Sequence, residues 1–92
     1  MTLIQAITDQ TARVGVIGLG YVGLPLAVTA AQQGYRVIGF DVDPTKINKI
    51  TSQDSYIDAV SAAALAKVCA AGLLDATSDF ARLAECQIII IC

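Results

Sequence analysis

The sequence predicts an α/β fold, with a parallel β-sheet and helices on both faces. Short apolar runs rich in β-branched residues alternate with segments of helical periodicity, an order typical of a parallel sheet with right-handed crossovers. The predicted strands span residues 13–18, 35–40, 73–77 and 88–92. The chain is 55% hydrophobic and only 15% charged, as expected for strands covered on both faces.

The segments between the strands carry helix start and stop signals. A helix is expected over residues 22–33, where Gly34 can form a left-handed C-cap. Asp43 followed by Pro44 indicates a cap and the first residue of a second helix, over 44–51. These signals lie between predicted strands, as crossovers of a parallel sheet require.

Further helices are expected on both sides of this central pattern. An alanine-rich helix is predicted between Ser61, its N-cap, and Gly72, which closes it. Ser78 or Asp79 can cap a turn of helix that ends near residue 83. Apolar residues at helical spacing also predict a short leading helix over residues 2–10.

Composition excludes several classes of partner. The formal net charge of the chain is −2, whereas nucleic-acid-binding proteins usually carry an excess of basic residues. No apolar run is long enough to cross a membrane, and the first residues do not resemble a signal peptide, so a cytoplasmic protein is expected. The cysteines are widely spaced and the chain has no histidine, so no metal site is expected. We expect Cys69, Cys86 and Cys92 to be small core residues.

A glycine pattern marks the junction between the first strand and the first helix. Residues 18–23 read Gly-Leu-Gly-Tyr-Val-Gly and fit G-x-G-x-x-G. The pattern alone is weak, but here it follows a strand directly and opens a helix, and Asp41 closes the next strand about 20 residues later. Together these features predict a Rossmann-type sheet that binds a dinucleotide.

Each position of this turn has an expected role. Gly18 allows the tight turn out of the strand, Gly20 lets a pyrophosphate approach the backbone, and Gly23 lets the helix pack closely on the sheet. The backbone N–H groups of about Tyr21 and Val22 would face the phosphates, assisted by the helix dipole. The alternative is a glycine-rich turn without a ligand.

Acidic and basic residues follow the second strand. Asp41 is the candidate ligand of the adenosine ribose, and its charge would repel a 2′-phosphate, which favours NAD over NADP. The alternative for Asp41 is a solvated acid at a strand end. Asp43 competes for this role, but Pro44 makes it the better helix cap. Lys46 lies near the expected ribose position, although chemistry alone also fits a surface lysine.

The sequence resembles a known enzyme family at these residues. Residues 16–27 read Val-Ile-Gly-Leu-Gly-Tyr-Val-Gly-Leu-Pro-Leu-Ala, and Gly-Phe-Asp-Val-Asp follows at 39–43. This pattern, with Lys46, resembles the UDP-glucose/GDP-mannose dehydrogenase family, and it is more specific than G-x-G-x-x-G because the variable positions match too. Segments 54–57 and 76–80 are most similar to the UDP-N-acetylglucosamine 6-dehydrogenase branch.

The resemblance implies an enzyme that oxidises the C6 alcohol of a nucleotide sugar, such as UDP-N-acetylglucosamine or UDP-glucose, to a carboxylate in two NAD-dependent steps. It implies that Asp41 and Lys46 contact the adenosine ribose, and that the backbone of Tyr21 and Val22 lines the pyrophosphate. The full-length enzyme is expected to be a homo-oligomer.

The same resemblance predicts that the chain is only part of the enzyme. The catalytic cysteine, lysine and asparagine of the family lie downstream, and none of the cysteines here matches the nucleophile. Residues 1–92 are therefore expected to form the N-terminal part of a dinucleotide-binding domain, truncated after the fourth strand and not catalytic alone. The last strand would then be an unprotected apolar edge through which the chain could self-associate.

Two other functions stay open at this point. A β-hydroxyacid or 6-phosphogluconate dehydrogenase shares the start of the glycine pattern, but usually has methionine where this chain has Val22. A non-catalytic NAD-sensing module would need the same fold and no catalytic residues. The full open reading frame would separate these alternatives, because the dehydrogenase needs a long second part.

Overall fold

The computed structural model describes residues 11–57 and 59–92. The helix expected over residues 2–10 lies outside the described residues. The described elements follow one another as β1 (Arg13–Ile17), α2 (Gly23–Gln32), β2 (Arg36–Phe40), α3 (Pro44–Thr51), α4 (Ala62–Ala70), β3 (Leu74–Thr77), the 3₁₀ helix η1 (Phe80–Glu85) and β4 (Ile88–Ile91).

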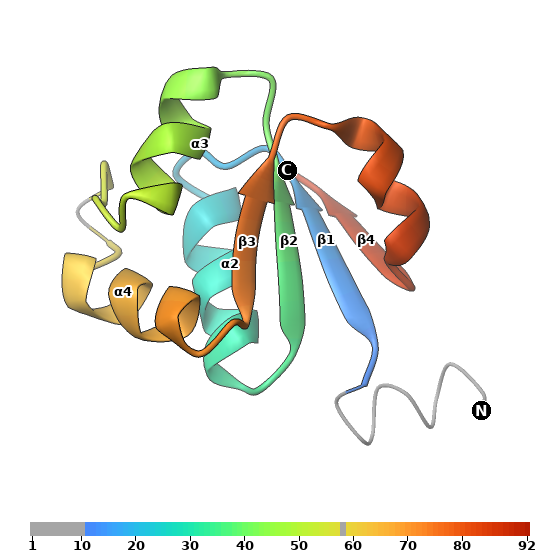
Figure 1. Ribbon diagram of the computed structural model, residues 1–92, viewed down its shortest axis with the longest axis horizontal. Helices are drawn as coiled ribbons and strands as arrows, with labels where there is room; N and C mark the ends of the chain where they lie inside the picture. The colour runs from blue at the N-terminus through green and yellow to red at the C-terminus, as the bar shows by residue number, and fades with distance from the viewer. Residues whose placement is uncertain (1–10, 58) are drawn as a thin grey trace.

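The four strands form one parallel sheet in the order β3-β2-β1-β4 (Figure 1). In the central strand β1, Val16 lies opposite Gly39 of β2 on one side and Ile90 of β4 on the other. This order is that of the first four strands of a Rossmann fold. The predicted α/β class and parallel sheet are confirmed.

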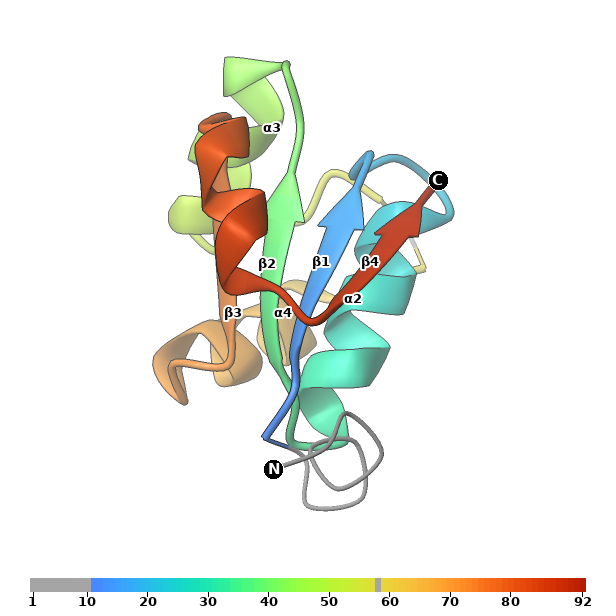
Figure 2. The same cartoon turned by 90° about the vertical axis from the view of Figure 1, so that its right-hand side faces the viewer.

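The helices lie on both faces of the sheet (Figures 1 and 2). Helices α2, α3 and α4 cover one face, where the main core lies. Its fully buried members include Val16, Leu24, Ala27, Ala31 and Leu65. Alanines on α2 let this helix approach the strands closely, so the burial of apolar surface is the main contribution to its stability.

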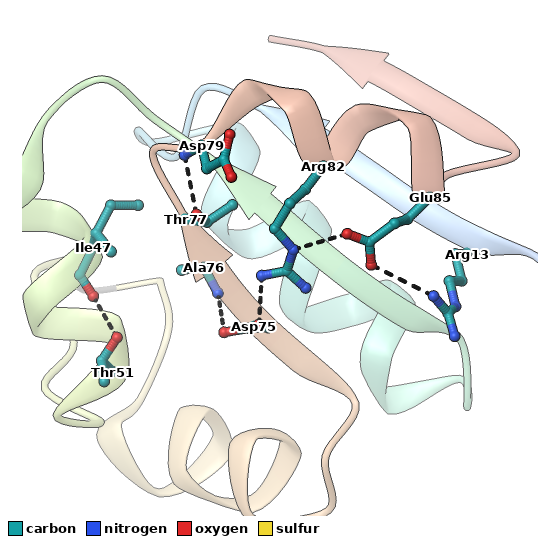
Figure 3. A network of polar contacts seen from close by, with 9 residues as sticks. All are labelled: Arg13, Ile47, Thr51, Asp75, Ala76, Thr77, Asp79, Arg82 and Glu85. Atoms are coloured by element: carbon teal, nitrogen blue, oxygen red, sulfur yellow. Dashed lines mark hydrogen bonds and ion pairs between the residues drawn. The ribbon is translucent and has the colours of Figure 1, made fainter.

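The short helix η1 covers the opposite face (Figure 2). Its Phe80 ring lies 5.7 Å from the ring of Phe40 in β2. Arg82 contacts Asp75 of β3 at 2.9 Å and Glu85 at 3.0 Å, as Figure 3 shows. Arg13 of β1 pairs with Glu85 at 3.5 Å. Such exposed pairs contribute about 0–1 kcal/mol each, so they orient η1 more than they stabilise it.

Most predicted helix signals are confirmed. Asp43 accepts a hydrogen bond from the N–H of Thr45, Ser61 does so from Ala64, and Asp79 does so from Ala81. The glycines that follow the C-termini of α2 and α4, Gly34 and Gly72, have positive φ angles of 100° and 73°. Because the side chain of Asp79 accepts the N–H of Ala81, Asp79 and not Ser78 is the cap of η1, which continues as a 3₁₀ helix through residue 85.

Strand β4 forms one edge of the sheet, as predicted. Its side chains alternate, so that Ile88 and Ile90 pack against the core while Ile89 and Ile91 are exposed. Self-association through this edge stays a prediction. The expectation that the cysteines are buried core residues is wrong for Cys92, which is exposed directly after β4, and Cys69 and Cys86 are only half-buried.

No helix in residues 11–57 and 59–92 is long and apolar enough to span a membrane. Within the same part of the chain, no group of three or more metal-ligating side chains gathers.

Candidate dinucleotide-binding site

The glycine loop, residues 18–23, lies where β1 ends and α2 begins (Figure 1). The carboxyl end of β2 lies beside it, because β1 and β2 are parallel neighbours. The N–H of Gly18 donates to the carbonyl of Phe40 at 2.8 Å and continues the ladder between the strands. The loop and the residues after β2 thus meet at one edge of the sheet, where ligands of such folds bind.

Gly18 and Gly23 are required by the turn itself. Gly18 has a φ of +92°, which favours glycine, and an added Cβ would lie 2.8 Å from the carbonyl oxygen of Cys92. A Cβ on Gly23 would collide with the carbonyl oxygen of Gly18. Gly18 directly follows β1, so this close approach of the start of α2 to the end of the strand fits the role expected of Gly23.

Gly20 differs from these two glycines. A Cβ added to Gly20 would meet nothing within 4 Å. The fold therefore does not require glycine here, and a side chain would extend only into the space outside the loop. This is the arrangement expected where a ligand approaches the backbone.

The N-terminus of α2 faces this open space without a cap of its own. No side chain hydrogen-bonds to it, and its first turn contains no acidic residue. The preceding side chains, Tyr21 and Val22, are 85% and 68% exposed. A helix N-terminus with free N–H groups and the positive end of a dipole binds anions.

Asp41 lies next to the loop with its side chain only 10% exposed. One carboxylate oxygen accepts the N–H of Leu19 and the other accepts the N–H of Asp43, both at 2.9 Å. Burial alone would raise the pKa of Asp41, but these hydrogen bonds and the charge of Lys46 together hold it below its usual value. The group is therefore a fixed carboxylate at neutral pH.

The structure brings Lys46 to this carboxylate. Its Nζ lies 3.8 Å from an oxygen of Asp41, and the lysine side chain is 36% exposed. Asp43 instead caps α3 through the N–H of Thr45, as its position before Pro44 predicts. Of the two aspartates, Asp41 is the one whose carboxylate is next to the glycine loop.

Two features of the site were not found by sequence reasoning. Tyr56, in the connection between α3 and α4, donates its hydroxyl to the carbonyl of Leu19 at 2.6 Å. The side chain of Leu19 is fully buried and lies against Gly39, where a Cβ would be 2.8 Å from it. The contact between Tyr56 and Leu19 joins residues far apart in the chain, which no local pattern signals.

Residues 12–92 match the family described as the UDP-glucose/GDP-mannose dehydrogenase family, NAD-binding domain. The chain belongs to this family. This assignment decides against a β-hydroxyacid or 6-phosphogluconate dehydrogenase, and it makes the fold an NAD-binding one.

Individual relatives differ in the sugar for which they are named. The UDP-N-acetyl-D-mannosamine dehydrogenase of Pyrococcus horikoshii is 37% identical over 81 residues, which is 87% of this chain and 19% of that protein. A crystal structure of GDP-mannose dehydrogenase from Pseudomonas aeruginosa superposes with a TM-score of 0.80 at 36% identity, covering 87% of this chain and 19% of the other. The structure of a UDP-glucose dehydrogenase from Pyrobaculum islandicum superposes with a TM-score of 0.77 at 29% identity. The match covers 88% of this chain and 19% of the other.

These comparisons correct one expectation. The sequence segments 54–57 and 76–80 favoured the UDP-N-acetylglucosamine branch, whereas these relatives are named for other sugars. The chain spans about a fifth of the length of the relatives it matches. The family assignment therefore describes this domain, and the reaction of the whole protein is a separate question.

Proposed function

We propose that this chain binds the ADP half of NAD at the glycine loop, as the cofactor-binding portion of a nucleotide-sugar 6-dehydrogenase. One observation carries the proposal: an uncapped helix N-terminus lies beside a fixed carboxylate. The first suits a pyrophosphate and the second suits the hydroxyls of a ribose. The open space at Gly20 fits a ligand that lies against the backbone.

Each predicted site residue has a role in this proposal. Gly18 and Gly23 shape the turn, and Gly20 leaves room for the pyrophosphate. The N–H groups of Tyr21 and Val22 donate to the phosphate oxygens. This donation replaces the side-chain cap that α2 lacks.

Asp41 and Lys46 hold the adenosine ribose. Each carboxylate oxygen of Asp41 already accepts one backbone N–H, and each has a further lone pair for a ribose hydroxyl. Lys46 contributes a donor beside the same oxygens. A 2′-phosphate would bring two negative charges against the partly buried Asp41, which favours NAD over NADP.

When bound, NAD would supply the hydride acceptor for oxidation at C6 of the sugar; two such oxidations, which consume two NAD and one water, would convert the alcohol to a carboxylate. The described residues at this site bind and orient the adenosine end of the cofactor, and we assign no catalytic residue among them.

The substrate is proposed to be a sugar joined to a nucleoside diphosphate. All three relatives described above are named for such a compound or its dehydrogenase. The UDP-N-acetyl-D-mannosamine enzyme is among the relatives that cover most of this chain. We therefore propose UDP-N-acetyl-D-mannosamine as the first substrate to try with the whole protein.

Calorimetric titration of the chain with NAD, ADP-ribose and NADP tests this function. NAD and ADP-ribose should bind with similar affinity, and NADP should bind at least about 10-fold more weakly, the factor that corresponds to 1.4 kcal/mol. The variant Asp41→Asn keeps an oxygen for the N–H of Leu19 but removes the negative charge. It should therefore reduce the difference in affinity between NAD and NADP. Equal binding of NAD and NADP to the unchanged chain would remove Asp41 from the ribose site.

A further inference from the structure

Leu19 is held from three sides, although it is the variable residue between two glycines of the loop. Its N–H donates to Asp41 at 2.9 Å, and its carbonyl accepts the Tyr56 hydroxyl at 2.6 Å. Its buried side chain fills the space left by the missing Cβ of Gly39. The peptide planes on both sides of Leu19 therefore have fixed orientations before any ligand is bound.

The plane that follows Leu19 determines where one N–H of the loop points. A trans peptide places its C=O and N–H in opposite directions, and no cis bond occurs in the described chain. Because the carbonyl of Leu19 points at Tyr56, the N–H of Gly20 points away from Tyr56. Within the described residues this N–H has no acceptor, and the Cα of Gly20 borders open space.

Tyr56 is itself fixed by the connection that carries it. The single O–H of the preceding Ser55 is shared between the carbonyl oxygens of Ile57 and Val60, which both lie within hydrogen-bond distance of it. The side chains of Ile57 and Val60 are 6% and 5% exposed and belong to the core. The position of the tyrosine ring thus follows from the packing of this connection and not from a ligand.

The Tyr56 hydroxyl remains a donor at every pH at which the protein would be studied. Burial, and then the negative charges of Asp41 and Asp43, raise the pKa of Tyr56 to about 12. A protonated hydroxyl beside two carboxylates still donates to the neutral carbonyl of Leu19, as the geometry shows.

We propose that Tyr56 is a positioning residue for the cofactor, whose hydroxyl turns the Leu19–Gly20 peptide so that the N–H of Gly20 faces the pyrophosphate. This inference rests on the proposed function. Asp41 fixes the preceding peptide plane in the same way, so the ribose ligand and Tyr56 together orient the phosphate-binding loop. Tyr56 acts through Leu19 and needs no contact with the nucleotide.

The variant Tyr56→Phe tests this role, because it removes one oxygen atom and keeps the ring. The two probes are ADP-ribose, which carries the pyrophosphate, and adenosine, which does not. The variant should bind ADP-ribose about 3- to 10-fold more weakly, the effect of one hydrogen bond. Adenosine binding, followed by ligand-observed NMR, should stay within a factor of two (about 0.4 kcal/mol).

A matched control removes the hydroxyl oxygen of another tyrosine, Tyr35. Tyr35 lies just before β2, at the other end of that strand from Asp41, and packs against the core. Tyr35→Phe should leave the affinities for both probes unchanged. The amide resonance of Gly20 supplies a ligand-free readout, which should move in Tyr56→Phe and stay in place in Tyr35→Phe.

The outcomes separate the two proposals. If the unchanged chain binds no ADP-ribose, the proposed function fails and the role of Tyr56 fails with it. If the unchanged chain binds ADP-ribose and Tyr56→Phe binds it equally well, only the positioning role is overturned. An equal loss of affinity for ADP-ribose and adenosine would also overturn it, because Tyr56 would then support the whole site.

Discussion

Helix α2 begins differently from the other helices of the described chain. Helices α3, α4 and η1 each start at a side chain that accepts a backbone N–H, whereas α2 starts at Val22 and has no such cap. A cap is worth about 0.5–2 kcal/mol, so its absence is a cost to the fold. The difference separates helix ends that complete the structure from the one that is available to a ligand.

The fold compensates for this cost in two places. Along α2, Leu24, Ala27 and Ala31 are fully buried, so packing stabilises the helix without a cap. In front of it, hydrogen bonds to both polar groups of Leu19 hold the loop. The free N–H groups therefore belong to a rigid turn, which a ligand need not order on binding.

The largest expected effect is on the turn itself. Replacing Gly23 by Leu would drive a Cβ into the carbonyl of Gly18 and should destabilise the protein by about 3 kcal/mol or more, because only a backbone shift relieves the collision. Urea unfolding followed by circular dichroism measures this change. Unchanged stability would mean that the loop adapts, and that the uncapped end of α2 is not rigid.

Gly20→Val is the matched change at the open position. We expect the unfolding free energy to stay within about 1 kcal/mol of that of the unchanged protein, because a Cβ at this position meets no atom within 4 Å apart from its chain neighbours. ADP-ribose binding should be lost, since the side chain occupies the space of the pyrophosphate. A variant that unfolds would show that Gly20 is structural, like Gly23.

A third change gives the uncapped start of α2 a negative charge. Val22→Asp places a carboxylate at the start of α2, where it interacts favourably with the helix dipole. Stability should rise by about 0.3–1 kcal/mol, while ADP-ribose affinity should fall at least about 10-fold. Stabilisation without loss of affinity would place the ligand elsewhere.

The matched change at a capped helix end is Ser61→Ala. It removes the acceptor of the Ala64 N–H, so stability should fall by about 1 kcal/mol. ADP-ribose affinity should not change, because the Ser61 hydroxyl bonds within its own helix end and not to the glycine loop. An altered affinity in a calorimetric titration would mean that the two kinds of helix end are coupled.

The smallest effect is the pH dependence of the contact between Asp41 and Leu19. The pKa of Asp41 is lower in the folded protein than its ordinary value near 4, so its stabilisation is fully present above that pH and is lost as the pH falls through the folded pKa. Asp41→Asn should reduce the loss of stability on acidification below about pH 4. An identical acid profile for both proteins would contradict a charge-dependent anchor.

Sequence reasoning was most successful where the signal is local. Asp43, Ser61 and the glycines at 34 and 72 act on neighbouring residues, so their roles could be predicted from type and spacing. The parallel sheet could be predicted too, because alternating strands and helices allow few topologies.

Local reasoning failed where residues distant in the chain meet. Nothing near Tyr56 indicates that its hydroxyl reaches Leu19, and nothing near Gly39 indicates that it accommodates the Leu19 side chain. Such contacts depend on the three-dimensional path of the chain.

A titration of the chain with ADP-ribose, followed by the backbone amide resonances, tests the central claim most directly. The account predicts the largest shifts at Gly20, Tyr21, Val22 and Gly23, with smaller ones at Asp41. The amides already capped in α4 and η1, those of Ala64 and Ala81, should stay in place. Shifts centred on a capped helix, or a glycine loop that does not respond at saturating ADP-ribose, would contradict it.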